Sequence, residues 1–172
     1  MVAIFLLVPL FLIRYGLLAL INKRALPKAA FFPPRKGVEN VFYWVYQMST
    51  VSIIIYMLFL EIETEFLGFY AGIVVYSLGI LLFAISTVNF SNPKGQDIKQ
   101  NGLYRFSRNP MYVSYFIYFL GCVILTRSLI LFLMLCCFQV SAHWIILAEE
   151  RWFKEKFEEQ YLLYKKKVRR YL

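Results

Sequence analysis

The sequence has few of the residues that build metal or redox centres. It contains three cysteines and one histidine, and the cysteines show no Cys-x-x-Cys spacing. We therefore expect no metal site, because zinc and iron–sulfur centres need clustered cysteine and histidine ligands. The cysteines, Cys122, Cys136 and Cys137, fall within apolar segments and are interpreted as small packing residues.

Charge is also scarce and uneven. Charged residues make up 17% of the chain, and 19 Lys and Arg face 10 Asp and Glu, for a net charge of +9. The basic residues lie in loops beside apolar segments, so attraction to anionic lipid headgroups explains the excess more simply than nucleic-acid binding does. The first apolar run contains Arg14 but has no basic leading region and no small-residue cleavage site. We therefore expect a mature helix there and not a signal peptide.

Apolar residues dominate what remains. They make up 60% of the chain, and aromatic residues make up 19%, whereas a soluble domain is nearer half apolar. The composition predicts an all-α integral membrane protein with a single bundle. A membrane-crossing helix needs roughly 20 apolar residues, and five segments qualify: 2–21, 41–60, 67–88, 110–125 and 128–148. Almost nothing separates the last two, which predicts a tight antiparallel hairpin.

The distribution of lysine and arginine predicts the orientation. The first loop, the third loop and the carboxyl-terminal tail are basic, whereas the second loop carries Glu61, Glu63 and Glu65; Arg127 is the one exception. The positive-inside rule then places the amino terminus outside and the carboxyl terminus in the cytoplasm. No sorting motif stands at the carboxyl end, so a bacterial or archaeal inner membrane is the simplest expectation. The oligomeric state stays open.

Three features are expected at the membrane interface. Arg14 should extend its guanidinium from the first helix toward the headgroups. Residues 26–40, with three prolines around Phe31-Phe32, read as an interfacial linker. Residues 151–171 alternate aromatic and lysine residues at three- and four-residue steps, which predicts a basic amphipathic surface helix. That helix is either an anchor or also a cover over a site.

The third loop carries turn-forming pairs at residues 92–95 and 101–102. Asn109-Pro110 is typical of a helix start, with Asn109 as the N-cap. The loop therefore delivers a polar group to the mouth of the fourth helix: Tyr104, Arg105, Arg108 and Asn109. The two arginines are either ligand-binding residues or positive charges that contact lipid phosphates.

The paired acids Glu149 and Glu150 end the fifth apolar segment, where the helix dipole favours cations. They either pair with a nearby arginine or bind the ribose hydroxyls or the ammonium of a zwitterionic cofactor, whose carboxylate an arginine would take. Gln139, His143 and Glu150 share one helical face, and polar residues in a span tend to face the bundle interior. His143 is either a hydrogen-bonded packing residue or a general base.

These motifs, in this order, resemble a known family. GLYRFSRNPMYVSYF, the paired glutamates and FEEQYLLYKKKVRRYL are similar to the isoprenylcysteine carboxyl methyltransferase family and to the wider group that includes phospholipid N-methyltransferases. The match covers residues 101–168. The resemblance implies S-adenosylmethionine at the cytoplasmic face and a lipophilic or prenylated acceptor reached from the bilayer. It implies these cofactor-binding residues: Gly102, Tyr104, Arg108, Asn109, Pro110, Tyr112, Glu149 and Glu150.

The resemblance also divides the single domain, 1–172, into a three-helix membrane scaffold (1–88) and a part with the cofactor-binding loop, the helical hairpin and the surface helix (89–172). The resemblance implies that the acceptor is an isoprenylcysteine-like carboxylate or a lipid headgroup. A carboxylate acceptor needs only orientation by a cation such as Arg108, whereas an amine or thiol must lose a proton, for which Glu150 or His143 is the candidate base.

The chain departs from the family pattern at four positions. Asn109 stands in place of a histidine, Ser114 and Glu158 in place of glycines, and Arg169 in place of a proline. Two rival interpretations remain: a non-catalytic membrane scaffold of the same fold, which Asn109 and Ser114 favour, and an NADPH-dependent membrane lipid reductase. Cofactor binding distinguishes the three.

Overall fold

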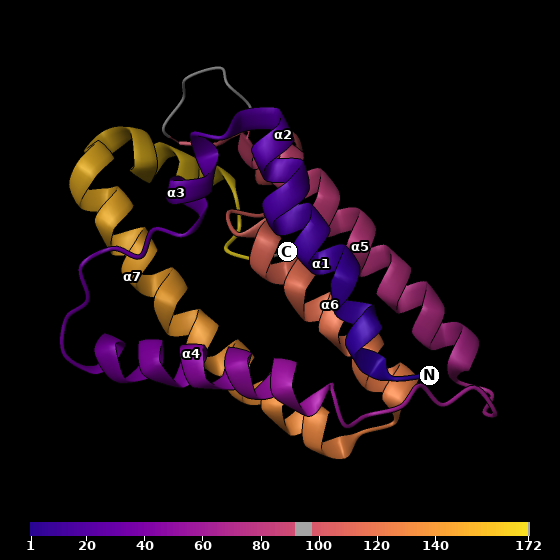
Figure 1. Cartoon of the computed structure of the whole chain (residues 1–172). Coiled ribbons are helices and arrows are strands. Elements are labelled where there is room, and N and C mark those ends of the chain that lie inside the picture. Colours follow the sequence, from indigo (N-terminus) through magenta and orange to yellow (C-terminus); the bar gives the residue numbers. More distant parts are fainter. Residues whose placement is uncertain (92–97, 172) are drawn as a thin grey trace.

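A computed structural model describes residues 1–91 and 98–171 of the chain, and its elements are helices (Figure 1). The predicted turn at residues 92–95 lies outside the described residues. The elements in chain order are the 3₁₀ helix η1 (Ala3–Leu7), α1 (Val8–Phe11), the π-helix η2 (Leu12–Leu17), α2 (Leu18–Asn22), α3 (Ala25–Ala29), α4 (Val38–Tyr56), α5 (Phe69–Ser91), the 3₁₀ helix η3 (Gly102–Arg105), α6 (Pro110–Thr126) and α7 (Leu129–Lys167). The elements η1 to α2 follow one another without a break and form one amino-terminal helix.

The helices confirm the predicted all-α integral membrane fold. Within the described residues, three segments are long and apolar enough to cross a membrane: Ala3–Asn22, Phe69–Ser91 and Leu129–Lys167. The helix α6 is apolar but shorter, at 17 residues. The predicted segment at 41–60 is also helical, as α4, but it is not among the spans that length and hydropathy identify, because polar residues such as Glu39 and Gln47 interrupt it.

The helices form two groups that diverge from a shared end. Figure 1 shows the amino-terminal helix, α5 and α6 side by side, while α4 packs on α7 and both lean away from them. The short predicted connection between α6 and α7 joins the groups at that end, but the two helices diverge from it and do not pack along their lengths as the predicted tight antiparallel hairpin would. Arg127, with φ 47°, closes α6, and the hydroxyl of Ser128 accepts a 3.1 Å hydrogen bond from Leu131 N to start α7. Chain segments 98–109 and 168–171 lie at the other, open end.

Two glycines allow α5 and α6 to pack backbone against backbone. A Cβ built on Gly79 would lie 2.4 Å from Tyr118 Cα, and one built on Gly121 would lie 2.5 Å from Tyr76 Cα. Each glycine therefore accepts the backbone of the opposing helix. Small residues at a helix crossing permit this close approach. The resulting van der Waals contact stabilises the helix pair in a membrane, where the hydrophobic effect does not drive helices together.

The aromatic residues near the carboxyl terminus build a second core. Tyr161, Tyr164 and Val168 are buried against Ile98, with Phe153 and Phe157 packed on them. These residues belong to the predicted surface helix at 151–171, but that helix has no start of its own. It is the continuation of α7, it ends at Lys167, and its aromatic side chains face this core. The segment packs into this core and not along a membrane surface because that buries the six apolar side chains of the cluster.

The second core depends on a break in α7 at Glu158. This residue has φ 41° and ψ −114°, a conformation that lies outside the helical region and that glycine adopts without penalty. The break turns the last part of α7 back toward the loop before α6. Glu158 stands at one of the positions where the family pattern has glycine, and the backbone angle supplies the physical reason for that glycine.

Replacing Gly79 by alanine should destabilise the fold by about 1–3 kcal/mol, because the added methyl meets a backbone atom of α6 and the helices must separate. The same change at Gly16, where nothing lies within 4 Å of the added carbon, is the matched control and should be neutral or stabilising. Thermal unfolding in detergent micelles measures both. Equal midpoints for the two variants would contradict the close crossing.

Replacing Glu158 by glycine should stabilise the protein by about 1 kcal/mol, because glycine removes the strain of a positive φ. Glu159→Gly is the control: its neighbouring, equally exposed position is helical, so the change should cost about 1 kcal/mol. Opposite shifts of the unfolding midpoint are expected. Destabilisation of both variants by the same amount would show that α7 is unbroken at 158.

Candidate functional site

Glu150 lies at the centre of an ionic cluster at the open end of the bundle. Glu150 is 6% exposed. Its carboxylate contacts Arg108 Nη2 at 3.1 Å, Arg170 Nε at 2.9 Å and Lys165 Nζ at 3.6 Å. These cations come from the loop before α6, the carboxyl-terminal tail and the end of α7. One carboxylate thus meets three cations, and the cluster keeps an excess of positive charge.

Arg108 is the most deeply placed cation of this cluster. Its side chain is 7% exposed, and its backbone N–H donates to the carbonyl of Arg169 at 2.9 Å. Two of its guanidinium nitrogens, Nε and Nη1, are buried without a hydrogen-bond partner among the described residues. Buried polar groups are nearly always paired, so unpaired donors of a buried cation mark a place where an anionic ligand would be stabilised.

The carboxyl-terminal tail, residues 169–171, lies across the site. Arg170 binds Glu150 through two hydrogen bonds, at 2.9 and 3.0 Å, and its carbonyl accepts from Asn109 Nδ2 at 3.1 Å. The hydrogen bonds to the carboxylate raise the pKa of Arg170, which therefore stays charged. The Tyr171 hydroxyl is 2.6 Å from His143 Nδ1. The tail thereby connects the loop before α6 to α7.

Glu149 points to a different part of the bundle from Glu150, because adjacent helical residues are separated by about 100°. Its Oε1 accepts a 3.0 Å hydrogen bond from the Tyr112 hydroxyl of α6. Its charge also interacts with that of Arg14 on the amino-terminal helix. The paired glutamates therefore serve two neighbouring regions: Glu150 the ionic cluster, and Glu149 a tyrosine-lined interior.

The other predicted residues of the loop shape it. Gly102 has φ 55°, and an added Cβ would lie 2.1 Å from Asn89 Nδ2, so both the backbone angle and the space require glycine. Tyr104 is buried, and its carbonyl accepts from the Tyr164 hydroxyl at 2.7 Å. Pro110 begins α6 as predicted. These contacts hold the loop that carries Arg108. A direct role of Gly102, Tyr104 and Pro110 in cofactor binding stays a prediction.

Asn109 is the N-cap residue of α6 as predicted, but its side chain makes no capping hydrogen bond to the helix. Its amide is used by the tail, and its backbone N–H donates to Ser107 Oγ at 3.1 Å. Ser114, another departure from the family pattern, donates its hydroxyl to the Pro110 carbonyl of its own helix at 2.7 Å. Both substitutions are thus accommodated by hydrogen bonds within the protein.

The predicted polar face of α7 is covered by the tail. His143 meets Tyr171, and Glu150 meets Arg170. Gln139, deeper in the helix, has a buried Oε1 without a partner among the described residues. The shared face predicted from the spacing is therefore one surface in the structure, but its covering by residues 169–171 was not predicted.

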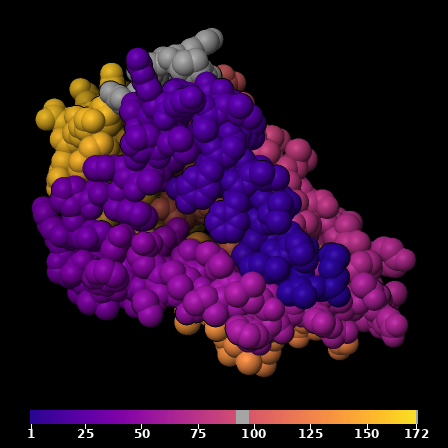
Figure 2. Space-filling view, viewed as in Figure 1, coloured from indigo at the N-terminus to yellow at the C-terminus, as the bar shows by residue number. Residues whose placement is uncertain are grey.

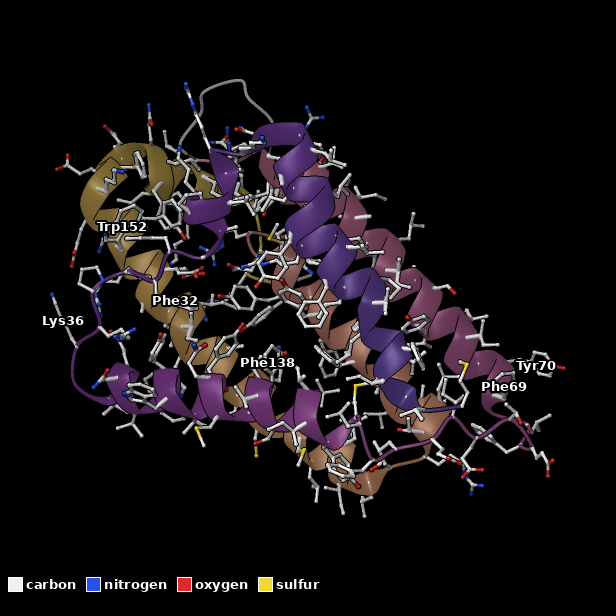
Figure 3. All side chains as sticks on the ribbon, viewed as in Figure 1. Phe32, Lys36, Phe69, Tyr70, Phe138 and Trp152 are labelled. Carbon is white, nitrogen blue, oxygen red and sulfur yellow. The ribbon has the colours of Figure 1, made fainter. Side chains whose placement is uncertain are left out.

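The residues expected at the interface make contacts within the protein. Arg14 Nη2 donates to the Ala29 carbonyl at 2.6 Å, inside the predicted interfacial linker, because α3 folds back over the amino-terminal helix; the position of Arg14 at the headgroups stays a prediction. In the linker, Phe32 packs on Tyr46 of α4 with ring centroids 6.2 Å apart, while Lys36 extends away from the molecule (Figure 3). Arg151 does not pair with the adjacent glutamates but with Glu39.

A hollow lies on one face of the molecule. Figure 2 shows it between the amino-terminal helix (indigo) and the linker and α4 (purple), with orange atoms of the helical hairpin on its floor. The structure also has a shallow pocket between the linker and α7, lined by Phe32, Pro33, Arg35, Glu39, Trp144, Ile145 and Ala148. Apolar and charged side chains together suit an amphiphile.

Sequence reasoning did not identify Arg14, Arg170 and Tyr171 as part of the site. The signal for Arg14 was its charge within an apolar run, and that for Arg170 and Tyr171 was an arginine–aromatic pair at the end of the last motif. All three reach the site only through tertiary folding.

Comparison with known proteins agrees with the residue pattern. The family model of phospholipid methyltransferases matches residues 71–160, more than half of the 172 residues. That region contains α6, the loop with Arg108 and the paired glutamates of α7. No curated protein and no solved structure matches the chain. With this match over the helices that build the site, the chain belongs to the phospholipid methyltransferase family.

Proposed function

We propose that this membrane methyltransferase transfers a methyl group from S-adenosylmethionine to a lipid-related amphiphile at the open end of the bundle. The proposal rests above all on Arg108, a buried cation with two donors that no described residue satisfies. Family membership supplies the reaction class, and the ionic cluster supplies a place for a zwitterionic cofactor.

The residues present fit such a cofactor. Its methionyl part carries a carboxylate and an ammonium. The excess positive charge around Glu150, together with the free donors of Arg108, suits the carboxylate, because charge-assisted hydrogen bonds to arginine are strong. Glu149 and Glu150 are acceptors for the ammonium or for ribose hydroxyls. Gly102, Tyr104, Asn109, Pro110 and Tyr112 complete the proposed binding region through the loop and the first turn of α6.

When bound, the cofactor supplies an electrophilic methyl group on a sulfonium. The protein's part is to hold donor and acceptor in line and to exclude water. The second core and the tail, which pack over the ionic cluster, are suited to excluding water. The hollow beside α4 gives an amphiphile a route from the bilayer.

The structure changes which residue is the best candidate for accepting a proton. Glu150 contacts three cations, which stabilise its ionised form and make it a weak base. His143 Nδ1 is occupied by the Tyr171 hydroxyl. The hydrogen bond that Glu149 accepts comes from a neutral group, the Tyr112 hydroxyl, so for an amine acceptor we favour Glu149 over Glu150 and His143. A carboxylate acceptor would need no base.

The proposed site faces the cytoplasm. The loop with Arg108, the end of α7 and the tail carry most of the basic residues outside the first loop. The positive-inside rule supports a cytoplasmic position for this end, where soluble S-adenosylmethionine is available.

Titration of the detergent-purified protein with S-adenosylmethionine, S-adenosylhomocysteine and NADPH, followed by thermal shift, tests the proposal. Both S-adenosyl compounds should stabilise the protein. Arg108→Gln should weaken their binding about 10-fold or more, since a hydrogen-bonded charge contributes about 1.5–3 kcal/mol. Arg105→Gln is the matched control, because Arg105 lies in the same loop but is exposed.

Three other results of the titration would contradict the proposed function or its buried site. Stabilisation by NADPH alone would replace the proposal with a reductase, and no response to any of the three compounds would leave a scaffold. Equal loss of binding in Arg105→Gln and Arg108→Gln would show that the net charge of the loop drives binding. The assignment of the ligand to the buried site at Arg108 would then be wrong.

A further inference from the structure

Arg14 is a charged residue in the middle of an apolar helix. The segment Ala3–Asn22 is long and apolar enough to cross a membrane, so a cation within it is costly to bury. Charged residues in such helices face the bundle interior or a cavity and commonly have a functional role. Arg14 lies outside the region that the family model matches, residues 71–160.

The helix is irregular where Arg14 lies. Residues Leu12–Leu17 form a π-helical turn. Such turns are rare and frequently occur at functional sites, because the extra residue redirects a side chain. Arg14 is partly buried, whereas Tyr15 next to it is 60% exposed. The turn thus directs the arginine inward and the tyrosine outward.

Among the residues that the structure describes, no anionic group is in contact with the positive charge of Arg14. Nη2 donates to the Ala29 carbonyl, and a side-chain hydrogen bond joins Arg14 to Tyr115 of α6, but both partners are neutral. Arg14 and Glu149 interact electrostatically, yet they form no ion pair within 4.0 Å. Glu149 is bonded to Tyr112 instead. A cation and a carboxylate therefore lie near each other without neutralising each other directly.

Tyrosines surround these two charges. Arg14 and Glu149 both interact electrostatically with Tyr46 of α4 and with Tyr104 of the loop. Tyr112 and Tyr115 add two further hydroxyls from α6. The hollow in Figure 2 runs between the amino-terminal helix, which carries Arg14, and α4, which carries Tyr46. A polar interior beside a lateral opening suits the headgroup of an amphiphile better than a soluble cofactor.

We propose that Arg14 binds the anionic group, a phosphate or a carboxylate, of the acceptor amphiphile, and so selects anionic or zwitterionic headgroups over neutral ones. The inference rests on the proposed methyl transfer and adds a residue from outside the matched region. Glu149, which accepts from the Tyr112 hydroxyl and interacts electrostatically with Arg14, would stabilise a cationic part of the same headgroup.

Binding of short-chain amphiphiles to the full-length protein in detergent, with S-adenosylhomocysteine present, tests the inference. The probes are dihexanoylphosphatidylethanolamine for the phosphate, N-acetyl-S-farnesylcysteine for the carboxylate and dioctanoylglycerol as the neutral comparison. The wild type should prefer one anionic probe, and Arg14→Gln should weaken that probe about 10-fold or more while dioctanoylglycerol changes little. Which anionic probe responds identifies the source of the anion. Arg24→Gln, at an exposed position just after the same helix, is the control.

The outcomes separate this inference from the proposed function. If Arg14→Gln still binds S-adenosylhomocysteine and both anionic probes as the wild type does, Arg14 only holds the Ala29 carbonyl, and the inference is wrong while the cofactor site stands. If the wild type does not bind S-adenosylhomocysteine, the proposed function itself fails. Should Arg14→Gln not fold, the wild type decides: equal affinity for dioctanoylglycerol and the anionic probes overturns the inference. Arg14→Lys, which keeps the charge, should retain the anionic preference.

Discussion

The carboxylate of Glu150 connects the parts of the chain on which the site depends. It contacts a cation from the loop before α6, one from the end of α7 and one from the tail. Placing such charges away from water is expensive, and only mutual contact with good hydrogen bonding compensates for it. The cluster therefore fixes how three segments meet, and it leaves two donors of Arg108 without a partner among the described residues. In the proposed function, ligand binding would depend on the same charges as stability.

The cluster can form only because the helices around it are arranged to bring its members together. The glycines of α5 and α6 let these helices touch along their backbones. This close crossing determines the position in space of the amino-terminal end of α6. The break at Glu158 turns the end of α7 back over the loop, so that Tyr164 reaches the Tyr104 carbonyl. The chain retains glutamate where the geometry favours glycine, and the burial of aromatic residues beyond the break compensates for the strain.

The two glutamates point to two different regions of the site. Glu150 meets the basic residues and Glu149 meets the Tyr112 hydroxyl; in the proposed function the first region would hold the cofactor carboxylate and the second would adjoin the acceptor headgroup. Adjacent positions on one helix supply both because they point in directions about 100° apart. Methyl transfer needs the two compounds in line and close together. In the proposed function, the neighbouring acids between the two regions would hold the two compounds in this arrangement.

The sequence by itself determined the helical class, the short connection between α6 and α7, the start of α6 at Pro110 and the family, because hydropathy, turn residues and motif spacing are local properties. It also placed Arg108 and the paired glutamates among the candidates. Only the tertiary structure decided that Arg170 and Tyr171 cover the polar face of α7 and that Arg14 turns inward. Those contacts join residues that are far apart in the chain, and nothing in local periodicity encodes which distant charge a buried carboxylate meets. The path of the backbone through the π-turn and the break at Glu158 decides that.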